Sequence, residues 1–568
     1  MPFNNGCDHE FRPVAHDTSG LVPERVRRDR RSVLGGGSPR RLTARTVRAS
    51  KRRSALAAEC SRVHDFVERW ATEKPEVEAV SFGERRVSWA QLDDRVRRAA
   101  GVLRASGIGP GDRFAVMDKN HLACLELTLA ASFTGAVNVV VNFRLASDEL
   151  VHVLDDSTAE VVVVGAEFAG LLDEIRGRLP RVREVILLGG DEDEYEARLA
   201  AAEPVAEPHR SAPEDCSLQL YTSGTTGWPK GAMLTQRSMT AHANALTPAY
   251  ELDETSTNVV AMPLFHVGGT SWALGGMSVG ARTILVREVA PAALLDLIEA
   301  TRATHAFFVP AVIHALIDDR ARARTAMADL RVLGHGGSPM PAPLMERVLR
   351  TVPTPLHSVY GMTEMSGVFC ALGPHEHRDE RRTHLRASAG RPLPGTEVRV
   401  VDPATGDDVE PGELGEFWVR SEQRMAGYWN MPEATAETIT PDGWLRTGDA
   451  GRRDGEGYLY IEDRVKDMII TGGENVYPAE VERVVLEYPG VAEVAVIGVA
   501  HDKWGETVQA VVVPDEGESL DEQALIDFTR SRLAHYKCPK SVSAVSALPR
   551  NPTGKVLKRQ LRSQLSDS

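Results

Sequence analysis

The segment of residues 221–231, YTSGTTGWPKG, combines three Gly and three Thr with one Ser and a single Lys. Gly and Pro disfavour regular helix and strand, so this segment is predicted to be a loop. In such a loop, backbone N–H groups, hydroxyls and one ammonium can surround anionic oxygens, as phosphate-binding loops do. The spacing is not that of the P-loop, G-x-x-x-x-G-K-[ST], because Lys230 follows Pro229 and precedes a Gly. On composition alone, a plain flexible turn remains an alternative.

Eight further polar and Gly-rich segments follow this loop along the chain. They are MPLFHVGG (262–269), GHGGSPMP (334–341), VYGMTEMSG (359–367), AGRPLPGTEVRVVD (389–402), GYWNMPEAT (427–435), GWLRTGDAG (443–451), GYLYIEDRVKDMIITGGENVYPAEVE (457–482) and PRNPTGKVLKRQL (549–561). Together with YTSGTTGWPKGAMLTQRS, the set resembles the adenylate-forming superfamily, which includes acyl- and aryl-CoA synthetases, peptide-synthetase adenylation domains and firefly luciferase. The resemblance covers roughly residues 62–562, and within the superfamily the sequence is most similar to fatty acyl-CoA ligases.

The resemblance implies a two-step reaction. ATP and a carboxylate give an acyl-adenylate and pyrophosphate, and a thiol then attacks the acyl carbon. In the first step a carboxylate approaches a polyanion, and two unit charges 4 Å apart repel by about 4 kcal/mol at an effective dielectric constant of about 20. Cations and oriented hydrogen-bond donors are therefore expected to supply most of the catalysis.

The resemblance also assigns roles to the residues that would hold the triphosphate. Thr363 and Glu364 match the residues that contact the α-phosphate and ligate Mg²⁺, an ion that prefers oxygen ligands. Thr226 is the second expected metal ligand. The residues that match the loop around the β- and γ-phosphates are Thr222, Ser223, Gly224, Thr225, Thr226, Gly227 and Lys230.

Other motifs match the nucleoside and the second half-reaction. Asp449 and Arg464 resemble the residues that bind the ribose and its phosphate, and Lys555 the lysine that bridges the acid and the α-phosphate. Lys466 stands at the position of the hinge about which the small domain turns. The segment against adenine corresponds to Gly336, Gly337, Ser338, Tyr360 and Gly361, and Gly472 and Gly473 would leave space for the pantetheine arm of coenzyme A.

The acid is expected to bind near His266, Gly268 and Gly269. Amino-acid-activating relatives carry an Asp in this region to pair with an ammonium group, and MPLFHVGGTSW has none, so a simple carboxylic acid is favoured. The small residues of 267–280 are expected to leave room for an apolar tail. Gln236 and Ser338 depart from the residues common in the family, and we expect both to lie near binding surfaces.

Several functions stay open at this point. The leading hypothesis is a fatty acyl-CoA synthetase that uses ATP, Mg²⁺ and coenzyme A. The alternatives are an aryl-CoA ligase, an acyl-AMP ligase that loads a carrier protein, and a silent nucleotide-binding scaffold. Acyl length, oligomeric state and pathway are not determined by the sequence, and a homo-oligomer is one of the open states.

Composition narrows the class of protein. The formal net charge of −14 argues against nucleic acid as the main partner. The six Cys show no CxxC spacing, which indicates reduced thiols in a cytoplasmic protein. No apolar run reaches the roughly 18 residues of a transmembrane helix. Residues 1–60 carry thirteen Lys and Arg against six Asp and Glu, which indicates a disordered basic arm; peripheral contact with anionic lipid is the alternative.

The motifs must be positioned by an α/β fold. Val-rich runs alternate with helical patterns, and this alternation is typical of a parallel sheet covered on both faces. We predict strands at 113–117, 136–141, 160–164, 183–190 and 282–288, with helices ending at Gly107 and spanning about 121–134 and 147–155. Three parts are expected: a basic extension (1–61), a large α/β domain with a small β-rich section (62–463), and a small mobile α+β domain (464–568).

Overall fold

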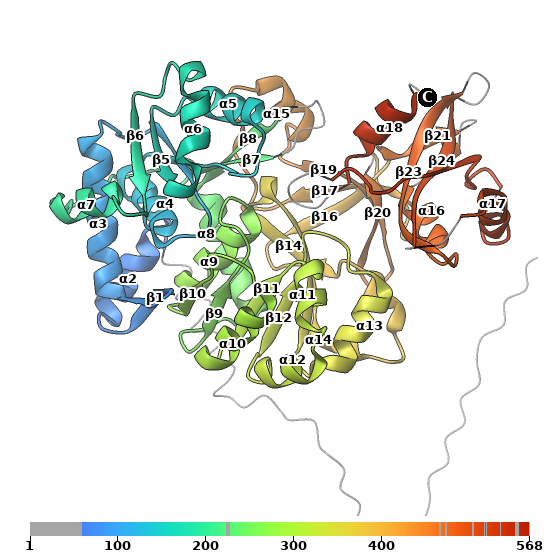
Figure 1. Cartoon of the computed structure of the whole chain (residues 1–568), viewed down its shortest axis with the longest axis horizontal. Helices are drawn as coiled ribbons and strands as arrows, with labels where there is room; N and C mark the ends of the chain where they lie inside the picture. Colours follow the sequence, from blue (N-terminus) through green and yellow to red (C-terminus); the bar gives the residue numbers. More distant parts are fainter. Residues whose placement is uncertain are drawn as a thin grey trace, which may run out of the picture. The chain divides into compact units, whose positions relative to one another are not determined.

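The computed structural model describes residues 60–222, 228–464, 467–471, 474–476, 478–501, 505–515, 517, 520–533, 535–550 and 556–566. The predicted Val-rich runs form part of a seven-stranded sheet (Figure 1). Its strands, in spatial order, are β18 (Gly427–Tyr428), β8 (Lys230–Thr235), β7 (Cys216–Thr222), β4 (Val137–Val140), β3 (Arg113–Met117), β5 (Val161–Gly165) and β6 (Glu184–Leu188). The five strands from β7 to β6 are parallel, whereas β8 and β18 add antiparallel pairs at one edge.

A second, nine-stranded sheet carries most of the later motifs. In spatial order it contains β15 (Arg391–Pro392), β14 (Gly367–Leu372), β13 (Leu356–Met362), β12 (Val332–His335), β11 (His305–Phe308), β9 (Thr257–Val260), β10 (Arg282–Leu285), β1 (Glu78–Phe82) and β2 (Arg85–Ser88). The strands from β13 to β1 are parallel. Their carboxyl ends therefore meet at one edge, where ligands of open α/β sheets usually bind.

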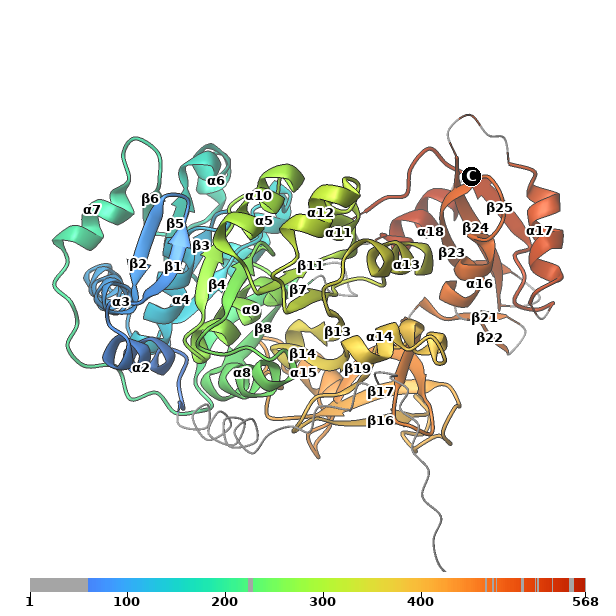
Figure 2. The same cartoon turned by 90° about the horizontal axis from the view of Figure 1, so that it is seen from below.

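Helices cover both sheets and form a shared layer between them. The shared core includes α2 (Asp65–Glu73), α3 (Trp89–Ala105), α4 (Leu122–Thr134), α7 (Glu194–Ala201), α8 (Gln236–Ala249) and α9 (Val267–Ser278). Figure 2 shows α8 and α9 next to each other, and α9 contacts strands β9 and β10. The outer face of the first sheet packs on α5 (Ser147–Asp156) and α6 (Ala169–Ile175), and that of the second on α10 (Pro291–Thr301), α11 (Pro310–Leu316), α12 (Arg320–Ala326) and α13 (Ala342–Thr351).

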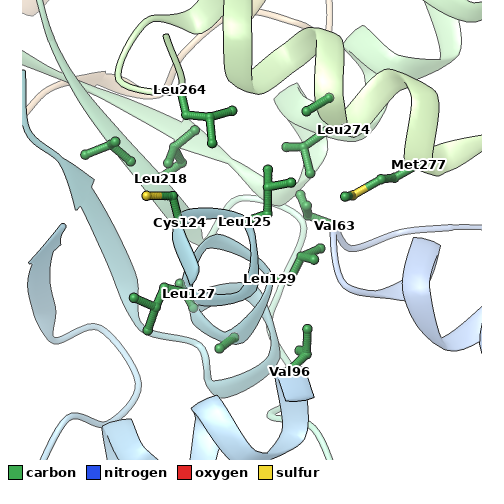
Figure 3. Packing of buried hydrophobic residues seen from close by; sticks show 14 of the residues in the cluster. Val63, Val96, Cys124, Leu125, Leu127, Leu129, Leu218, Leu264, Leu274 and Met277 are labelled. Atoms are coloured by element: carbon green, nitrogen blue, oxygen red, sulfur yellow. The ribbon is translucent and has the colours of Figure 1, made fainter. Parts of the chain in front are cut away.

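Helix α4 shows why the central layer is stable. All thirteen of its residues are buried, and Leu125 and Leu129 lie among side chains from neighbouring elements (Figure 3). Its one charged residue, Glu126, is paired with Arg95, whose Nη2 lies 3.0 Å from Glu126 Oε2. Gly135 ends the helix in the left-handed conformation that Gly adopts without strain. The sequence prediction of a buried helix followed by a buried strand is confirmed here, as are the other predicted strands and helices.

The C-terminal part contains two smaller sheets. The first is antiparallel and consists of β16 (Glu397–Val401), β17 (Gly415–Arg420), β19 (Leu445–Arg453) and β20 (Leu459–Arg464). The second consists of β22 (Glu474–Val476), β21 (Ile469–Thr471), β24 (Gly505–Pro514), β23 (Val491–His501) and β25 (Ser541–Ala544), with α16 (Pro478–Val485), α17 (Glu522–Arg530) and α18 (Lys558–Ser566). This is the predicted β-rich section followed by an α+β unit. Among the described residues, no helix has the length and apolar character needed to cross a membrane.

The remaining helical segments are short. They are α14 (Pro374–Arg378), α15 (Pro432–Thr438), η1 (Ala166–Phe168), η2 (Arg176–Arg178), η3 (Thr363–Met365) and η4 (Thr383–Ala387). Of these, η3 comes directly after β13 and carries two of the predicted site residues, Thr363 and Glu364. Residues 1–59 of the predicted basic extension, and with them the alternative of lipid contact, lie outside the described residues.

Candidate active site

The predicted adenine segment lies at the carboxyl ends of neighbouring parallel strands. Gly336, Gly337 and Ser338 follow β12, and Tyr360 and Gly361 lie near the end of β13. Gly336 is buried, whereas Gly337 and Ser338 are exposed. A register shift of the β13–β14 pair falls between Tyr360 and Gly361. The strand order therefore brings these two motifs, 24 residues apart in sequence, to the same edge of the sheet.

Tyr360 is hydrogen-bonded to the carboxylate predicted to bind ribose. Its hydroxyl donates to Asp449 Oδ2 over 2.6 Å, and both side chains are buried. The Tyr360 ring packs against Phe369, with ring centroids 4.6 Å apart. Asp449 lies on β19, opposite Arg464 in the antiparallel register with β20. Predicted adenine and ribose residues from distant segments are thus in direct contact.

Glu364, the predicted metal ligand, lies on η3 with its side chain buried. Tyr428 donates a hydrogen bond to Glu364 Oε1 over 2.8 Å, and Thr222 Oγ1 lies 3.5 Å from the same oxygen. The backbone N–H of Met425 donates to the Glu364 carbonyl over 2.9 Å. Thr363 precedes Glu364 and is half-buried. The donor set here is oxygen-rich, which fits Mg²⁺.

The predicted phosphate loop connects two paired strands. Thr222 ends β7 and Lys230 begins β8, and the two residues are register partners. Lys230 Nζ lies 5.2 Å from the centroid of the Tyr428 ring. After the loop, the exposed Trp228 packs against His152, with ring centroids 4.9 Å apart. The strand pairing of Thr222 with Lys230 and the packing of Trp228 on His152 therefore hold the two ends of the loop.

A buried polar network supports β7 below this loop. Arg113 Nε donates to Gln219 Oε1 over 2.9 Å, and Gln219 Nε2 donates to the Tyr221 hydroxyl over 3.1 Å. Tyr221 in turn donates to Asp156 Oδ2 over 2.6 Å. Burial and the neighbouring Asp156 raise the pKa of Tyr221 far above its usual range, so its hydroxyl stays protonated and acts as a donor. The network fixes the strand that enters the loop.

His266, Gly268 and Gly269 lie at the start of α9. His266 precedes the helix, its Nε2 is buried, and that atom has no hydrogen-bond partner among the described residues. Burial, with the charge of Arg144, lowers the pKa of His266 to about 4, so the imidazole is neutral at pH 7. Gly268 is half-buried, and a Cβ there would lie 3.4 Å from the Phe307 ring.

The expectation that the small residues of 267–280 leave room for an apolar tail is wrong for three glycines of α9. A Cβ at Gly269 would come within 2.2 Å of the Pro263 carbonyl. At Gly275 and Gly276, a Cβ would lie 2.7 Å from Leu246 and 2.7 Å from Asn258, respectively. These glycines allow α9 to pack closely on its neighbours. The neighbouring atoms therefore fill the space that the missing side chains would otherwise leave for a ligand.

The expectation that Gln236 lies near a binding surface is also wrong. Its side chain is fully buried at the start of α8. Gln236 Oε1 accepts hydrogen bonds from Val63 N over 3.0 Å and from Ser132 Oγ over 2.8 Å. Gln236 therefore connects α4, α8 and the segment before α2. Ser338, the other departure, is exposed at the predicted adenine segment.

Several predicted site residues lie outside the described residues. The structure gives the backbone of Arg464, on β20, and not its side chain. The others in this group are Ser223, Gly224, Thr225, Thr226, Gly227, Lys466, Gly472, Gly473 and Lys555.

The structure adds residues near the site that the sequence reasoning missed. Asn120 donates from Nδ2 to the carbonyls of Met262 and Val286, both over 3.0 Å, and accepts from Leu264 N over 2.8 Å. It thereby holds the segment that leads to His266. His242 Nε2 accepts from Val368 N over 3.0 Å, just beyond the TEMSG motif. Neither contact has a sequence signal, because each joins segments more than a hundred residues apart.

A second group of metal-ligand side chains lies away from this site. His64, Asp65 and Glu68 offer three ligand atoms within 4.8 Å of one another. Two guanidinium groups already pair with the carboxylates: Arg62 Nη2 lies 2.9 Å from Asp65 Oδ1, and Arg97 Nη2 lies 2.8 Å from Glu68 Oε1. Both carboxylates of this group are therefore already paired with guanidinium groups, which disfavours a metal ion there.

Comparison with known proteins defines the class. A family model described as AMP-binding enzyme matches residues 67–429, and one described as AMP-binding enzyme C-terminal domain matches residues 480–555. The chain belongs to the AMP-binding enzyme family. It is therefore an adenylate-forming ligase.

Three relatives indicate the range of chemistry. A feruloyl-CoA synthase of an Amycolatopsis species is 40% identical over 499 residues, which cover 87% of this chain and 97% of that protein. The fatty acid–[acyl-carrier-protein] ligase ScoC of Streptomyces coeruleorubidus is 35% identical over 497 residues, 87% of this chain and 94% of that protein. The solved structure of a Mycobacterium tuberculosis fatty acyl CoA synthetase matches with a TM-score of 0.74 at 35% identity, covering 89% of this chain and 99% of that one.

Proposed function

We propose that this protein is an AMP-forming acid–thiol ligase. A carboxylate oxygen attacks the α-phosphorus of ATP and pyrophosphate leaves; the sulfur of coenzyme A then attacks the acyl carbon and AMP leaves. The observation that carries the proposal is that predicted nucleoside and phosphate residues meet around the end of β13. There Tyr360 contacts Asp449, and Glu364, on the η3 turn that follows, contacts Thr222 of the hairpin that holds the predicted phosphate loop.

The nucleoside is assigned to the edge formed by β12 and β13. The Tyr360 ring would lie against adenine, and Asp449 would accept hydrogen bonds from the ribose hydroxyls. Arg464 supports the ribose–phosphate. The backbone that borders adenine is assigned to Gly336, Gly337, Ser338 and Gly361.

The phosphates are assigned to the hairpin and to η3. Lys230, with Thr222 and residues 223–227, would hold the β- and γ-phosphates, and Thr363 would contact the α-phosphate. Glu364 and Thr226 would hold Mg²⁺, and the oxygen donors around Glu364 fit that ion. The ion, when bound, neutralises phosphate charge during attack by the carboxylate. The side chains of this chain orient the phosphates and keep the loop in place.

The acid is assigned to the region of His266 and Gly268. Phe307 lies against Gly268 and Gly336: a Cβ at either glycine would be 3.4 or 3.5 Å from its ring. An aromatic wall beside small residues suits an apolar acid, and we propose a fatty acid as the substrate class. An aryl acid is the second candidate, because the same wall could stack on a ring and the feruloyl-CoA synthase is 40% identical.

The two half-reactions need different chemical groups beside the acyl carbon: a lysine during adenylation and a thiol during thioester formation. Lys555 is assigned to bridge the acid and the α-phosphate, and Lys466 to the hinge that removes it. Gly472 and Gly473 would then border the pantetheine arm. We propose that residues 62–463 and 464–568 are the two parts that alternate, since domain rotation lets one site serve two steps.

The experiment is a panel of carboxylic acids read by ATP-dependent AMP formation, with coenzyme A or an acyl-carrier protein as the acceptor. We expect AMP and acyl-CoA with at least one fatty acid of the panel. A preference for cinnamic-type acids would favour the aryl-CoA candidate, and thioester only on the carrier protein would favour the carrier-loading ligase. No acid-dependent AMP with any acid would reject the proposed function.

A further inference from the structure

The ring of Tyr428 lies between two predicted site residues of opposite charge. Tyr428 ends the two-residue strand β18, which pairs with β8, and its register partner is Ala232, two residues after Lys230. Its side chain is 8% exposed. The Tyr428 backbone N–H donates to Thr435 Oγ1 over 2.9 Å, which fixes this short strand against α15.

The hydroxyl of Tyr428 holds the anionic partner. It donates to Glu364 Oε1 over 2.8 Å. Three residues earlier, Met425 N donates to the carbonyl of the same Glu364 over 2.9 Å. The segment 425–428 therefore holds Glu364 by its backbone and by one carboxylate oxygen. With Oε1 engaged in this way, Oε2 is the oxygen that we assign to a divalent ion.

The face of the Tyr428 ring contacts the cationic partner. Lys230 Nζ lies 5.2 Å from the ring centroid, within the range of roughly 6 Å for a cation–π interaction. Lys230 begins β8 directly after the predicted phosphate loop and faces Thr222 across the hairpin. One tyrosine thus contacts both the expected metal ligand and the expected phosphate-binding lysine.

We propose that Tyr428 is a positioning residue. Its hydroxyl orients the Glu364 carboxylate toward the divalent ion, and its ring orients the Lys230 ammonium toward the phosphates. This inference rests on the proposed function. It predicts that the two contacts can be removed separately. Tyr428→Phe removes the hydroxyl and keeps the ring, whereas Tyr428→Leu removes both.

The test measures binding of Mn²⁺, a spectroscopic substitute for Mg²⁺, by the loss of its free electron paramagnetic resonance signal in the presence of ATP, beyond the loss that the same ATP causes without protein. We expect Tyr428→Phe to weaken Mn²⁺ binding by about tenfold, as for loss of one hydrogen bond to a charged group. At saturating Mg²⁺, its inhibition by pyrophosphate should stay within about twofold of wild type, because the face toward Lys230 remains. Tyr428→Leu should lose Mn²⁺ affinity equally and also weaken pyrophosphate inhibition by about threefold to tenfold.

Two controls make the result specific. Tyr458 is a second buried tyrosine whose hydroxyl donates to a carboxylate, Glu376, over 3.3 Å. Tyr458→Phe should leave Mn²⁺ and pyrophosphate binding unchanged. In a Glu364→Gln background, Tyr428→Phe should cause no further loss of Mn²⁺, because the hydroxyl acts through that carboxylate.

Several outcomes would overturn the inference. Mn²⁺ binding by Tyr428→Phe within about twofold of wild type would remove the role of the hydroxyl. A Tyr428→Phe protein that melts too low for the measurement, where Tyr458→Phe does not, would make Tyr428 a packing residue only. Wild-type protein that binds no Mn²⁺ with ATP would remove the metal role of Glu364. Wild-type protein that binds Mn²⁺ with ATP and forms no acid-dependent AMP would reject the proposed function and leave the Tyr428 comparison readable.

Discussion

The hydrogen bond between Tyr360 and Asp449 gives the most direct prediction about nucleotide binding. Tyr360→Phe removes a hydroxyl that donates to Asp449 Oδ2 over 2.6 Å between two buried side chains. A hydrogen bond to a charged group contributes about 1.5–3 kcal/mol. The ring stays packed on Phe369, so contact with adenine is kept. Only the orientation of Asp449, the carboxylate that we propose binds ribose, should be lost.

We expect this loss to weaken ATP binding by about tenfold to a hundredfold, since about 1.4 kcal/mol corresponds to a factor of ten. The assay is calorimetric titration with a non-hydrolysable ATP analogue and with its 2′-deoxy form. Wild type should prefer the ribose form, and Tyr360→Phe should lose most of that preference. Tyr458→Phe, which loses a hydroxyl–carboxylate bond elsewhere, should bind as wild type does. Unchanged affinity and unchanged ribose preference in Tyr360→Phe would rule out a role of the Tyr360 hydroxyl in nucleotide binding.

Three further predictions concern stability and the acid site. Burial lowers the pKa of His242 to about 4, below the usual 6.5, so the unfolded state takes up a proton first and stability is lost as the pH falls from 6.5 toward 4. At pH 5 this loss is about 2 kcal/mol, and the urea midpoint of wild type should fall more steeply with pH than that of His242→Gln. Glu126→Gln breaks a buried pair with Arg95 and should lower the free energy of unfolding by about 3 kcal/mol, with AMP formation at 25 °C unchanged; a loss below about 1 kcal/mol in urea unfolding would contradict this. Asn120→Ala removes two hydrogen bonds to the segment before His266 and one to the Val286 carbonyl, and it should raise KM for the acid about tenfold, with KM for ATP within about twofold; equal rises in both would count against a role in acid binding.

The fold was largely predictable because its strands are strongly patterned. Strands β3, β4 and β5 are short apolar runs bounded by turn residues, and the helix before Gly135 has no polar face to leave exposed. Such runs have few alternatives to burial within a parallel sheet. The order of the motifs also predicted that Tyr360 and Asp449 serve one nucleoside, and the structure brings them into contact.

The errors and omissions arose where a residue's role depends on what packs against it. Gly275 and Gly276 suggested space, and the space is filled by Leu246 and Asn258. Gln236 was expected near a binding surface, yet its amide oxygen accepts a hydrogen bond from Val63 N inside the core. Tyr428 could not be found because its partners lie 64 and 198 residues away in sequence. Pattern and spacing carry no information about such contacts.

The proposed reaction begins with activation of a carboxylic acid by adenylation. The most direct measurement is pyrophosphate release from ATP and Mg²⁺ with and without a fatty acid, in the wild type and in Lys555→Ala. We expect release that depends on the acid in the wild type and falls by about a hundredfold or more in Lys555→Ala, as expected when a charged transition-state contact is lost. Release that does not require the acid, or that is unchanged in Lys555→Ala, would contradict the proposed reaction.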